Sequence, residues 1–111
     1  MALITSCSYL DFPNNAEGNT YEGYDPDIGI VTMSFDKPGK INFFSTATGN
    51  EKLNYYLTAK NRMIINKTFL FNNWQITLLD AYAYEDHIIL KWKYNENKTY
   101  SLILNQITDK T

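Results

Sequence analysis

The sequence holds few of the residues from which metal and redox sites are built. Among its 111 residues there is one cysteine, Cys7, and one histidine, His87. A single cysteine excludes an internal disulfide, and a zinc site draws its ligands mainly from several Cys and His residues. We therefore predict no metal site and no cofactor.

Clustered positive charge is also missing. The net charge is −2, and the lysines are scattered along the chain. A nucleic-acid-binding face gathers basic residues on one surface, so nucleic acid is not an expected partner. No run approaches the roughly 20 apolar residues of a membrane-spanning helix. The one membrane attachment that we predict is a lipid anchor, considered below.

The sequence shows no pattern of residues that is typical of a catalytic site. His87 follows Glu85 and Asp86 in a predicted hairpin turn, which is typical of a solvated residue, whereas a Ser-His-acid triad needs three converging groups. Asp25 and Asp27 flank a proline in another turn, without the ligand pattern of a calcium loop. A glycine-rich phosphate loop is absent too. We predict no catalytic residue and a function other than an enzyme's.

What the sequence contains is typical of a single β-rich domain. Hydrophobic residues make up 44% and charged residues 20%, a balance that indicates a globular chain and not a disordered one. Aromatic residues reach 15% and β-branched residues are common, which favours pleated, half-buried sheets. Nowhere do apolar residues keep a helical spacing over about ten residues, so we predict no helix.

Eight runs of strand-like sequence, separated by turn residues, predict an all-β fold. Their starts are roughly 8–13 residues apart, a spacing typical of a sandwich or barrel. Short links favour antiparallel neighbours in an up-and-down meander, and closing a barrel would remove its two unpaired edges. We therefore predict a closed or nearly closed small barrel and keep the sandwich as the alternative. The predicted strands are Tyr21–Asp25, Ile28–Phe35, Lys40–Thr46, Glu51–Thr58, Met63–Phe71, Trp74–Tyr84, His87–Tyr94 and Thr99–Asn105.

The strand His87–Tyr94 carries the clearest alternation. Ile88, Leu90, Trp92 and Tyr94 share one face, and Lys91 and Lys93 share the other. Successive side chains of a strand point to opposite faces. We therefore predict that the apolar set points inward and that the two lysines point outward.

Aromatic residues of the preceding strand have no clear direction. Trp74, Tyr82 and Tyr84 have the same parity, but Asp80 shares it. The three aromatic residues are candidates for an exposed surface that docks a protein or stacks on sugar rings. The alternative is ordinary cross-strand packing.

The inward faces of the predicted strands together supply candidates for the lining of a lumen. A barrel of eight strands is just wide enough to be filled by side chains or to hold one small ligand. The two alternatives are a fully packed core and a cavity for an apolar or amphipathic ligand. The lumen candidates are Phe35, Phe43, Tyr55, Leu57, Leu90, Trp92 and Tyr94.

The amino terminus contains a short pattern that resembles a signal for lipid attachment. Ile4-Thr5-Ser6-Cys7 resembles a bacterial lipobox, which implies a lipid attached to Cys7 and a place in the bacterial cell envelope if a signal peptide lies upstream. The alternative is a cytoplasmic protein with a free thiol. We predict a tail or tether over residues 1–19, a domain over residues 20–108, and a short tail over residues 109–111.

Several segments resemble small bacterial lipocalin-like domains of the calycin type, over about residues 20–107. They are Gly23-Tyr24, the Phe35–Gly39–Ile41 turn, Tyr55-Tyr56 leading into Met63–Ile65, and the hairpin from Ile88–Leu90 to Tyr100–Leu104. The Gly-x-Trp pattern of lipocalins is not kept, because Gly23 is followed by Tyr24-Asp25. The resemblance implies a lipid-anchored meander barrel that encloses a small apolar ligand.

Three functions follow as hypotheses, none of them enzymatic. The first is a lipocalin-like barrel that binds a small apolar or amphipathic ligand. The second is a protein-interaction module, such as an inhibitor or immunity protein. The third is a carbohydrate-binding module. An internal cavity would favour the first, a filled lumen with an apolar outer patch the second, and a groove with flat aromatic rings the third.

Overall fold

Nine antiparallel strands form one meander sheet in the computed structural model, which describes residues 11–13, 16–71, 73–95 and 98–107. The described residues contain no helix, and hence none long and apolar enough to cross a membrane. The predicted all-β fold is confirmed. The strands are β1 (Thr20–Asp25), β2 (Gly29–Ser34), β3 (Lys40–Ser45), β4 (Gly49–Asn54), β5 (Tyr56–Ala59), β6 (Arg62–Phe71), β7 (Trp74–Ala83), β8 (His87–Tyr94) and β9 (Lys98–Gln106).

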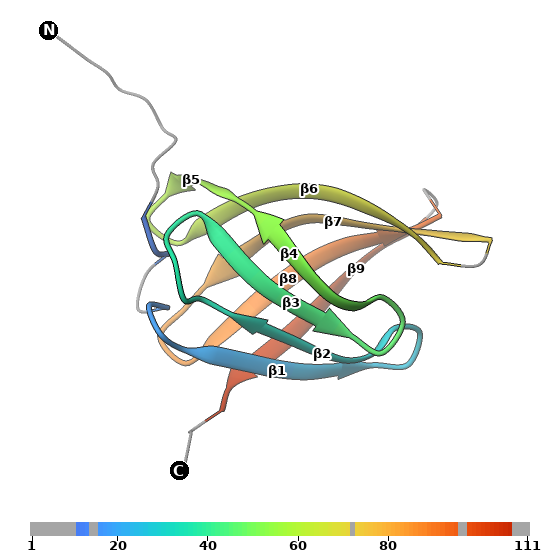
Figure 1. The fold of residues 1–111 in the computed structure, drawn as a ribbon, viewed down its shortest axis with the longest axis horizontal. Helices are drawn as coiled ribbons and strands as arrows, with labels where there is room; N and C mark the ends of the chain where they lie inside the picture. Colours follow the sequence, from blue (N-terminus) through green and yellow to red (C-terminus); the bar gives the residue numbers. More distant parts are fainter. Residues whose placement is uncertain (1–10, 14–15, 72, 96–97, 108–111) are drawn as a thin grey trace, which may run out of the picture.

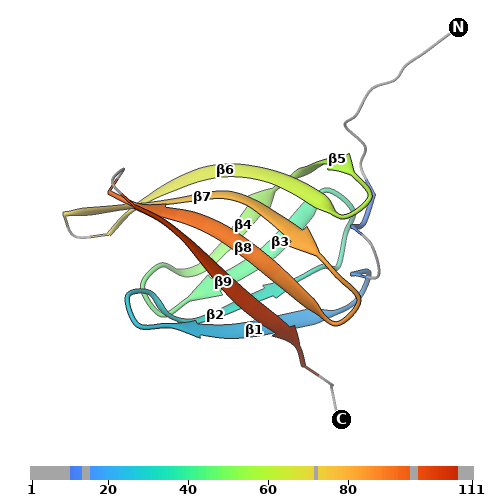
Figure 2. The same ribbon diagram turned by 180° about the vertical axis from the view of Figure 1, so that it is seen from behind.

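The first and last strands pair, so the sheet curls into a nearly closed barrel (Figures 1 and 2). The strand order is β4-β3-β2-β1-β9-β8-β7-β6-β5. The two end strands of this order, β4 and β5, follow each other in the chain and are separated only by Tyr55. The sheet therefore turns back on itself through one continuous segment, and β4 and β5 remain its two edge strands.

The run predicted as one strand over Glu51–Thr58 is two strands with a break at Tyr55. Before the break β4 pairs with β3, and after it β5 pairs with β6. At the break, the backbone N–H of Tyr55 donates a hydrogen bond of 3.1 Å to the carbonyl of Gly39. The segment changes pairing partner here, because one straight strand cannot follow both sides of a tightly curved sheet.

The alternation of β8 places its side chains as predicted. Ile88, Leu90 and Trp92 are fully buried. Lys91 is exposed, and Lys93 and Tyr94 are half-buried. Period-two alternation therefore identified the inner face of this strand.

A bulge at Leu79 explains the mixed parity of β7. Leu78 pairs with Trp92 and Asp80 pairs with Lys91, so Leu79 is an extra residue between them. Such a residue turns the strand over. Leu78 therefore points inward, whereas Asp80 and Tyr82, although of the same parity, lie on the outer face.

Part of the segment predicted as a tail covers one end of the barrel. Ala16 is completely buried, and Phe12 packs against the core. The backbone N–H of Gly18 donates a 2.8 Å hydrogen bond to the carbonyl of Phe35. The hydroxyl of Tyr55 donates a hydrogen bond to the carbonyl of Asp11. Residues 11–13 and 16–19 thus contact the barrel, while residues 1–10 and 109–111 lie outside the described residues.

Substitution of Tyr55 by phenylalanine is expected to loosen this end of the barrel. Loss of the bond to Asp11 should cost about 0.5–1.5 kcal/mol at neutral pH. Burial raises the pKa of the Tyr55 phenol above its ordinary value. The unfolded chain then ionises first, so stability that is present below about pH 10 is lost as the pH rises further.

Unfolding in denaturant at neutral pH and through the alkaline range measures both effects. The Tyr55→Phe variant should lose stability less steeply above about pH 10 than the original protein. Tyr24→Phe, at an exposed tyrosine, is the control and should change neither quantity. An unchanged alkaline profile for Tyr55→Phe would contradict the prediction.

Candidate functional site

The predicted lumen residues come together, and they pack against one another. The rings of Phe35 and Tyr55 meet edge to face, with centroids 6.1 Å apart. Phe43 stacks on Phe69 at 6.1 Å, and Trp92 stacks on Tyr100 at 4.9 Å. Of the seven lumen candidates, Phe35, Phe43, Tyr55, Leu57, Leu90 and Trp92 are buried, and Tyr94 is half-buried.

The barrel is flattened, with a shortest dimension of 20 Å. Sheets that pack face to face are typically about 10 Å apart, a gap that one layer of interdigitated side chains can fill. The aromatic residues predicted to line a lumen are part of the buried core or pack against it. Binding of a small apolar ligand there stays a prediction, and the outer surface offers better-defined sites.

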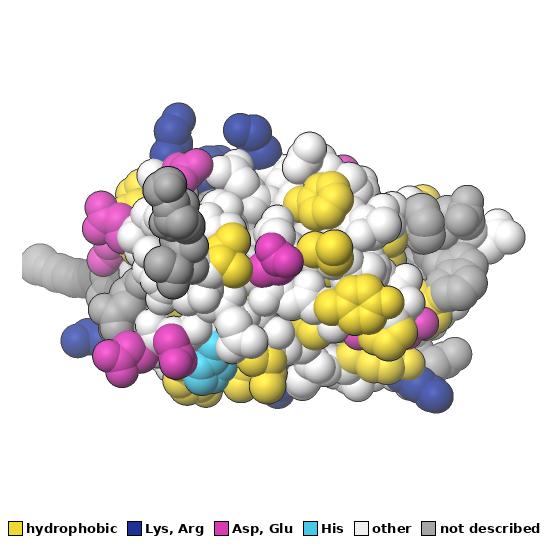
Figure 3. Space-filling model, turned by 90° about the horizontal axis from the view of Figure 1, so that it is seen from below, with side chains coloured by type: hydrophobic (Ala, Val, Ile, Leu, Met, Phe, Trp, Pro, Cys, Tyr) yellow, Lys and Arg dark blue, Asp and Glu magenta, His cyan; other side chains and the backbone are white. Residues whose placement is uncertain are grey.

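A row of apolar side chains crosses the outer face of five strands. Tyr24 is 65% exposed, Ile103 55% and Ile30 45%, all large exposed hydrophobic residues. Ile89 and Tyr82 are half-buried and complete the row. Figure 3 shows hydrophobic side chains gathered on this side of the molecule. We call these five residues the apolar row.

The register of the sheet accounts for the row. Ile30 pairs with Tyr24, Ile103 pairs with Ile89, and Ile89 pairs with Tyr82. Glu22 pairs with Asn105, where the ladder between β1 and β9 ends, and Tyr24 and Ile103 lie two residues beyond this pair on the two neighbouring strands. The row therefore consists of a cross-strand pair on β1 and β2 and three paired residues on β7, β8 and β9, on strands that are neighbours in the sheet.

Polar side chains border the apolar row on both sides. On one side lie Glu22, Asn105 and His87, which the sheet pairs in that order. On the other side Lys91 pairs with both Ser101 and Asp80. The row is thus an apolar centre with a polar margin.

Arg62 closes one end of the apolar row. It donates a hydrogen bond of 2.8 Å to a carboxylate oxygen of Asp80, which raises the pKa of Arg62. Its guanidinium lies 5.7 Å from the centre of the Tyr82 ring, and the ammonium of Lys91 lies 5.9 Å from the same ring. These two cation–π contacts hold the Tyr82 ring between Arg62 and Lys91.

The surface aromatic candidates have separate places. Tyr82 belongs to the apolar row. Tyr84 is exposed and stacks on His87 at 4.9 Å between ring centres. The His87 ring forms a 2.8 Å contact with Asp86 that lowers the pKa of this carboxyl group. The side chain of Trp74 lies outside the described residues, so no ladder of three aromatic rings is established.

Sequence reasoning missed the three most exposed members of the row. The signal for Ile30 and Ile103 was present in the sequence, because both residues alternate with inward-facing neighbours in their own strands and must therefore face outward. Alternation alone could not show that Tyr24 lies between them, because that depends on the pairing of β1 with β9.

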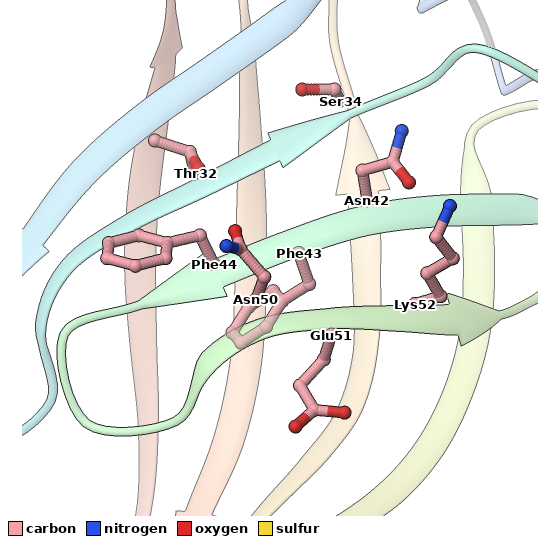
Figure 4. Close-up of a pocket in the computed structure, with 8 residues that line it drawn as sticks. All are labelled: Thr32, Ser34, Asn42, Phe43, Phe44, Asn50, Glu51 and Lys52. Carbon is pink, nitrogen blue, oxygen red and sulfur yellow. The ribbon is translucent and has the colours of Figure 1, made fainter.

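A polar trough is hollowed into the outer face of β2, β3 and β4 (Figure 4). Its first part has a volume of about 340 Å³. The ring of Phe44 stands between Thr32 and Asn50, and beside them Asn42 stands between Ser34 and Lys52. Glu51 also borders this part, but its carboxylate points away from Lys52 and Asn42 (Figure 4).

The second part of the trough is charged. It has a volume of about 400 Å³ and shares Asn42 and Lys52 with the first part. Lys40 donates a 2.7 Å hydrogen bond to Asn54, and Asn42 donates one of 2.9 Å to Asp36. Its lining residues are Asp36, Lys37, Lys40, Asn42, Lys52 and Asn54.

Comparison with family models, curated proteins and solved structures finds no match for this chain. The resemblance to lipocalin-like domains therefore stays a prediction. Within the described residues there is no group of three or more His, Cys, Asp or Glu side chains that could hold a metal ion. Cys7 lies outside those residues, so lipid attachment stays a prediction that labelling with palmitate would test.

Proposed function

We propose that this chain is a non-enzymatic binding domain that docks a protein partner through the apolar row. The observation that carries the proposal is the exposure of three large apolar side chains, Tyr24, Ile30 and Ile103, on the neighbouring strands β1, β2 and β9. Single exposed hydrophobic residues are common, whereas a contiguous apolar patch with a polar border marks an interaction surface.

The row has the composition of an interface core. Tyrosine and large aliphatic side chains gain most from being covered, and a fully buried one contributes roughly 1.5–3 kcal/mol. Two of its members, Tyr24 and Tyr82, are of the residue type enriched in binding hot spots. The charged and amide side chains around the row fit the polar rim of such interfaces.

The packing of the inward side chains supports the same proposal. The large inward side chains of β2, β3 and β8 are already used to stabilise the fold, so the barrel serves as a rigid platform. The row lies on paired strands and not on loops, which favours docking with little rearrangement. The envelope location inferred from Cys7 would put this platform where other envelope proteins can reach it.

Substitution of Ile103 by lysine tests the proposal. Burial of an ammonium group at the centre of the row should weaken partner binding by about 100-fold or more, while the exposed position should leave the fold intact. Crosslinking and native mass spectrometry of protein purified from its own host would identify the partner, and titration with that partner would give the affinity.

The matched control is Thr58→Lys, which adds the same charge at an exposed position of β5, outside the row. This control should bind the partner as the original protein does. Equal binding by Ile103→Lys would show that the row is not the interface. Sedimentation of the purified chain alone separates a second copy of this chain from a different protein.

A further inference from the structure

We infer that the polar trough on β2, β3 and β4 is a binding site for an acidic oligosaccharide, distinct from the apolar row. The trough combines an aromatic ring, several amide and hydroxyl groups, and lysines, and these three kinds of group are segregated along its length. Each kind matches a different part of a negatively charged sugar chain.

The neutral part of the trough suits a sugar ring. Phe44 offers a half-buried ring between Thr32 and Asn50. The apolar face of a pyranose can lie on an aromatic ring, while its hydroxyl groups need partners that both donate and accept hydrogen bonds. Amides and hydroxyls do both. Among the described residues, the side chains of Thr32 and Asn50 have no hydrogen-bond partner within the protein and are available to a ligand.

The charged part of the trough suits an anionic group. Three ammonium groups, on Lys37, Lys40 and Lys52, face one carboxylate, on Asp36. That leaves two positive charges in excess. Within the described part of the chain, Lys37 and Lys52 form no ion pair or side-chain hydrogen bond. An ammonium group without a partner can form a charge-assisted hydrogen bond to an incoming anion.

The internal hydrogen bonds of the trough hold its polar groups in place. Asn54 fixes the ammonium of Lys40, and Asp36 fixes the amide of Asn42 so that its carbonyl oxygen remains free to accept. Groups that are positioned before binding lose little entropy when the ligand arrives.

The length of the trough points to a chain of sugars. Its three cross-strand levels are marked by Phe44, Asn42 and Lys40, at alternate residues of β3. Alternate residues on a strand are roughly 6.8 Å apart, so the outer levels are about 14 Å apart. This span is that of a short oligosaccharide. Nucleic acid, which requires more phosphate-neutralising residues than three lysines, fits less well.

A titration with trigalacturonate and with its methyl ester tests the inference, because the ester keeps the sugar chain but replaces each carboxylate charge by a neutral methyl ester. The acid should bind at least tenfold more tightly than the ester, and added salt should reduce this difference. Amide chemical shifts of the ¹⁵N-labelled protein should move on β2, β3 and β4. A sulfated oligosaccharide of equal length serves to tell carboxylate from sulfate preference.

Substitution of single lysines tests which of them accounts for the preference for the acidic sugar. Lys52→Gln should weaken binding of the acid about tenfold and leave that of the ester unchanged, whereas Lys60→Gln, at an exposed lysine outside the trough, should change neither. Equal affinity for acid and ester would overturn the assignment of an anionic ligand. Shifts outside β2–β4, or no binding of any of the three sugars, would overturn the site itself.

Discussion

Substitution of Trp92 by alanine is expected to lower the free energy of unfolding by about 3–5 kcal/mol, a large share of the ~5–15 kcal/mol that stabilises a typical domain. Trp92 is completely buried. Its ring stacks on Tyr100 at 4.9 Å and meets Tyr94 edge to face at 6.0 Å. Because the strands around it are paired on both sides, the sheet cannot collapse into the space left by the indole.

Denaturant unfolding followed by circular dichroism measures this loss, and Trp92→Phe is the matched control. Among the described residues the indole N–H of Trp92 is buried without a hydrogen-bond partner. Phenylalanine removes this unpaired donor and keeps most of the ring, so its cost should be about 1.5 kcal/mol or less. Equal losses for the two variants would contradict this account of the core.

Substitution of Gly23 by alanine is expected to weaken the pairing of β1 with β9 that closes the barrel. An added Cβ would lie 2.5 Å from the carbonyl oxygen of Ile103 and 2.8 Å from a methyl carbon of Leu104. The methyl group can rotate away, but the carbonyl belongs to the backbone of β9. Separating the two strands should cost about 1–3 kcal/mol, and a larger loss is expected if the closing pair opens completely.

Hydrogen exchange shows where this loss falls. Amides of β1 and β9 should exchange faster in Gly23→Ala, while those of β6 and β7 should keep most of their protection. Gly49→Asn is the control, because a Cβ at Gly49 meets nothing within 4 Å and asparagine tolerates its positive φ of 79°. A uniform rise in exchange over all strands would indicate that the β1–β9 pair has no special role.

The closing pair also accounts for part of the sequence pattern at Gly23-Tyr24. Glycine is required there because the backbone of β9 passes so close. The next residue, Tyr24, points outward and takes part in the apolar row. The same dipeptide therefore serves both the closure of the barrel and the proposed docking surface.

Local pattern was sufficient for most strands and for the core. Alternation along β8 identified Ile88, Leu90 and Trp92 as inward-facing, and turn residues such as Pro38-Gly39 marked strand ends. The facing of a strand and the positions of its ends depend on residues only a few positions apart. The alternation of apolar residues and the presence of turn residues therefore predict them directly. The antiparallel meander followed from the short links.

Nonlocal features could not be predicted in this way. The bulge at Leu79 turns β7 over, so Asp80 and Leu78 lie on opposite faces despite equal parity. The break at Tyr55 depends on where the barrel closes. Both arise from the fit of one strand to its partners, which a single strand's sequence does not encode.

The sequence by itself determined the class of fold and the inner face of its clearest strand. Only the tertiary structure decided which side chains meet. It packed the predicted lumen residues into the core, and it placed the exposed Tyr24, Ile30 and Ile103 on three neighbouring strands. It also gathered Phe44, Asn42 and Lys52 into one trough. The physical reason is that the surface of a sheet is formed by residues of several strands, which are brought together by the register of strand pairing. The sequence pattern shows only which residues are neighbours within one strand.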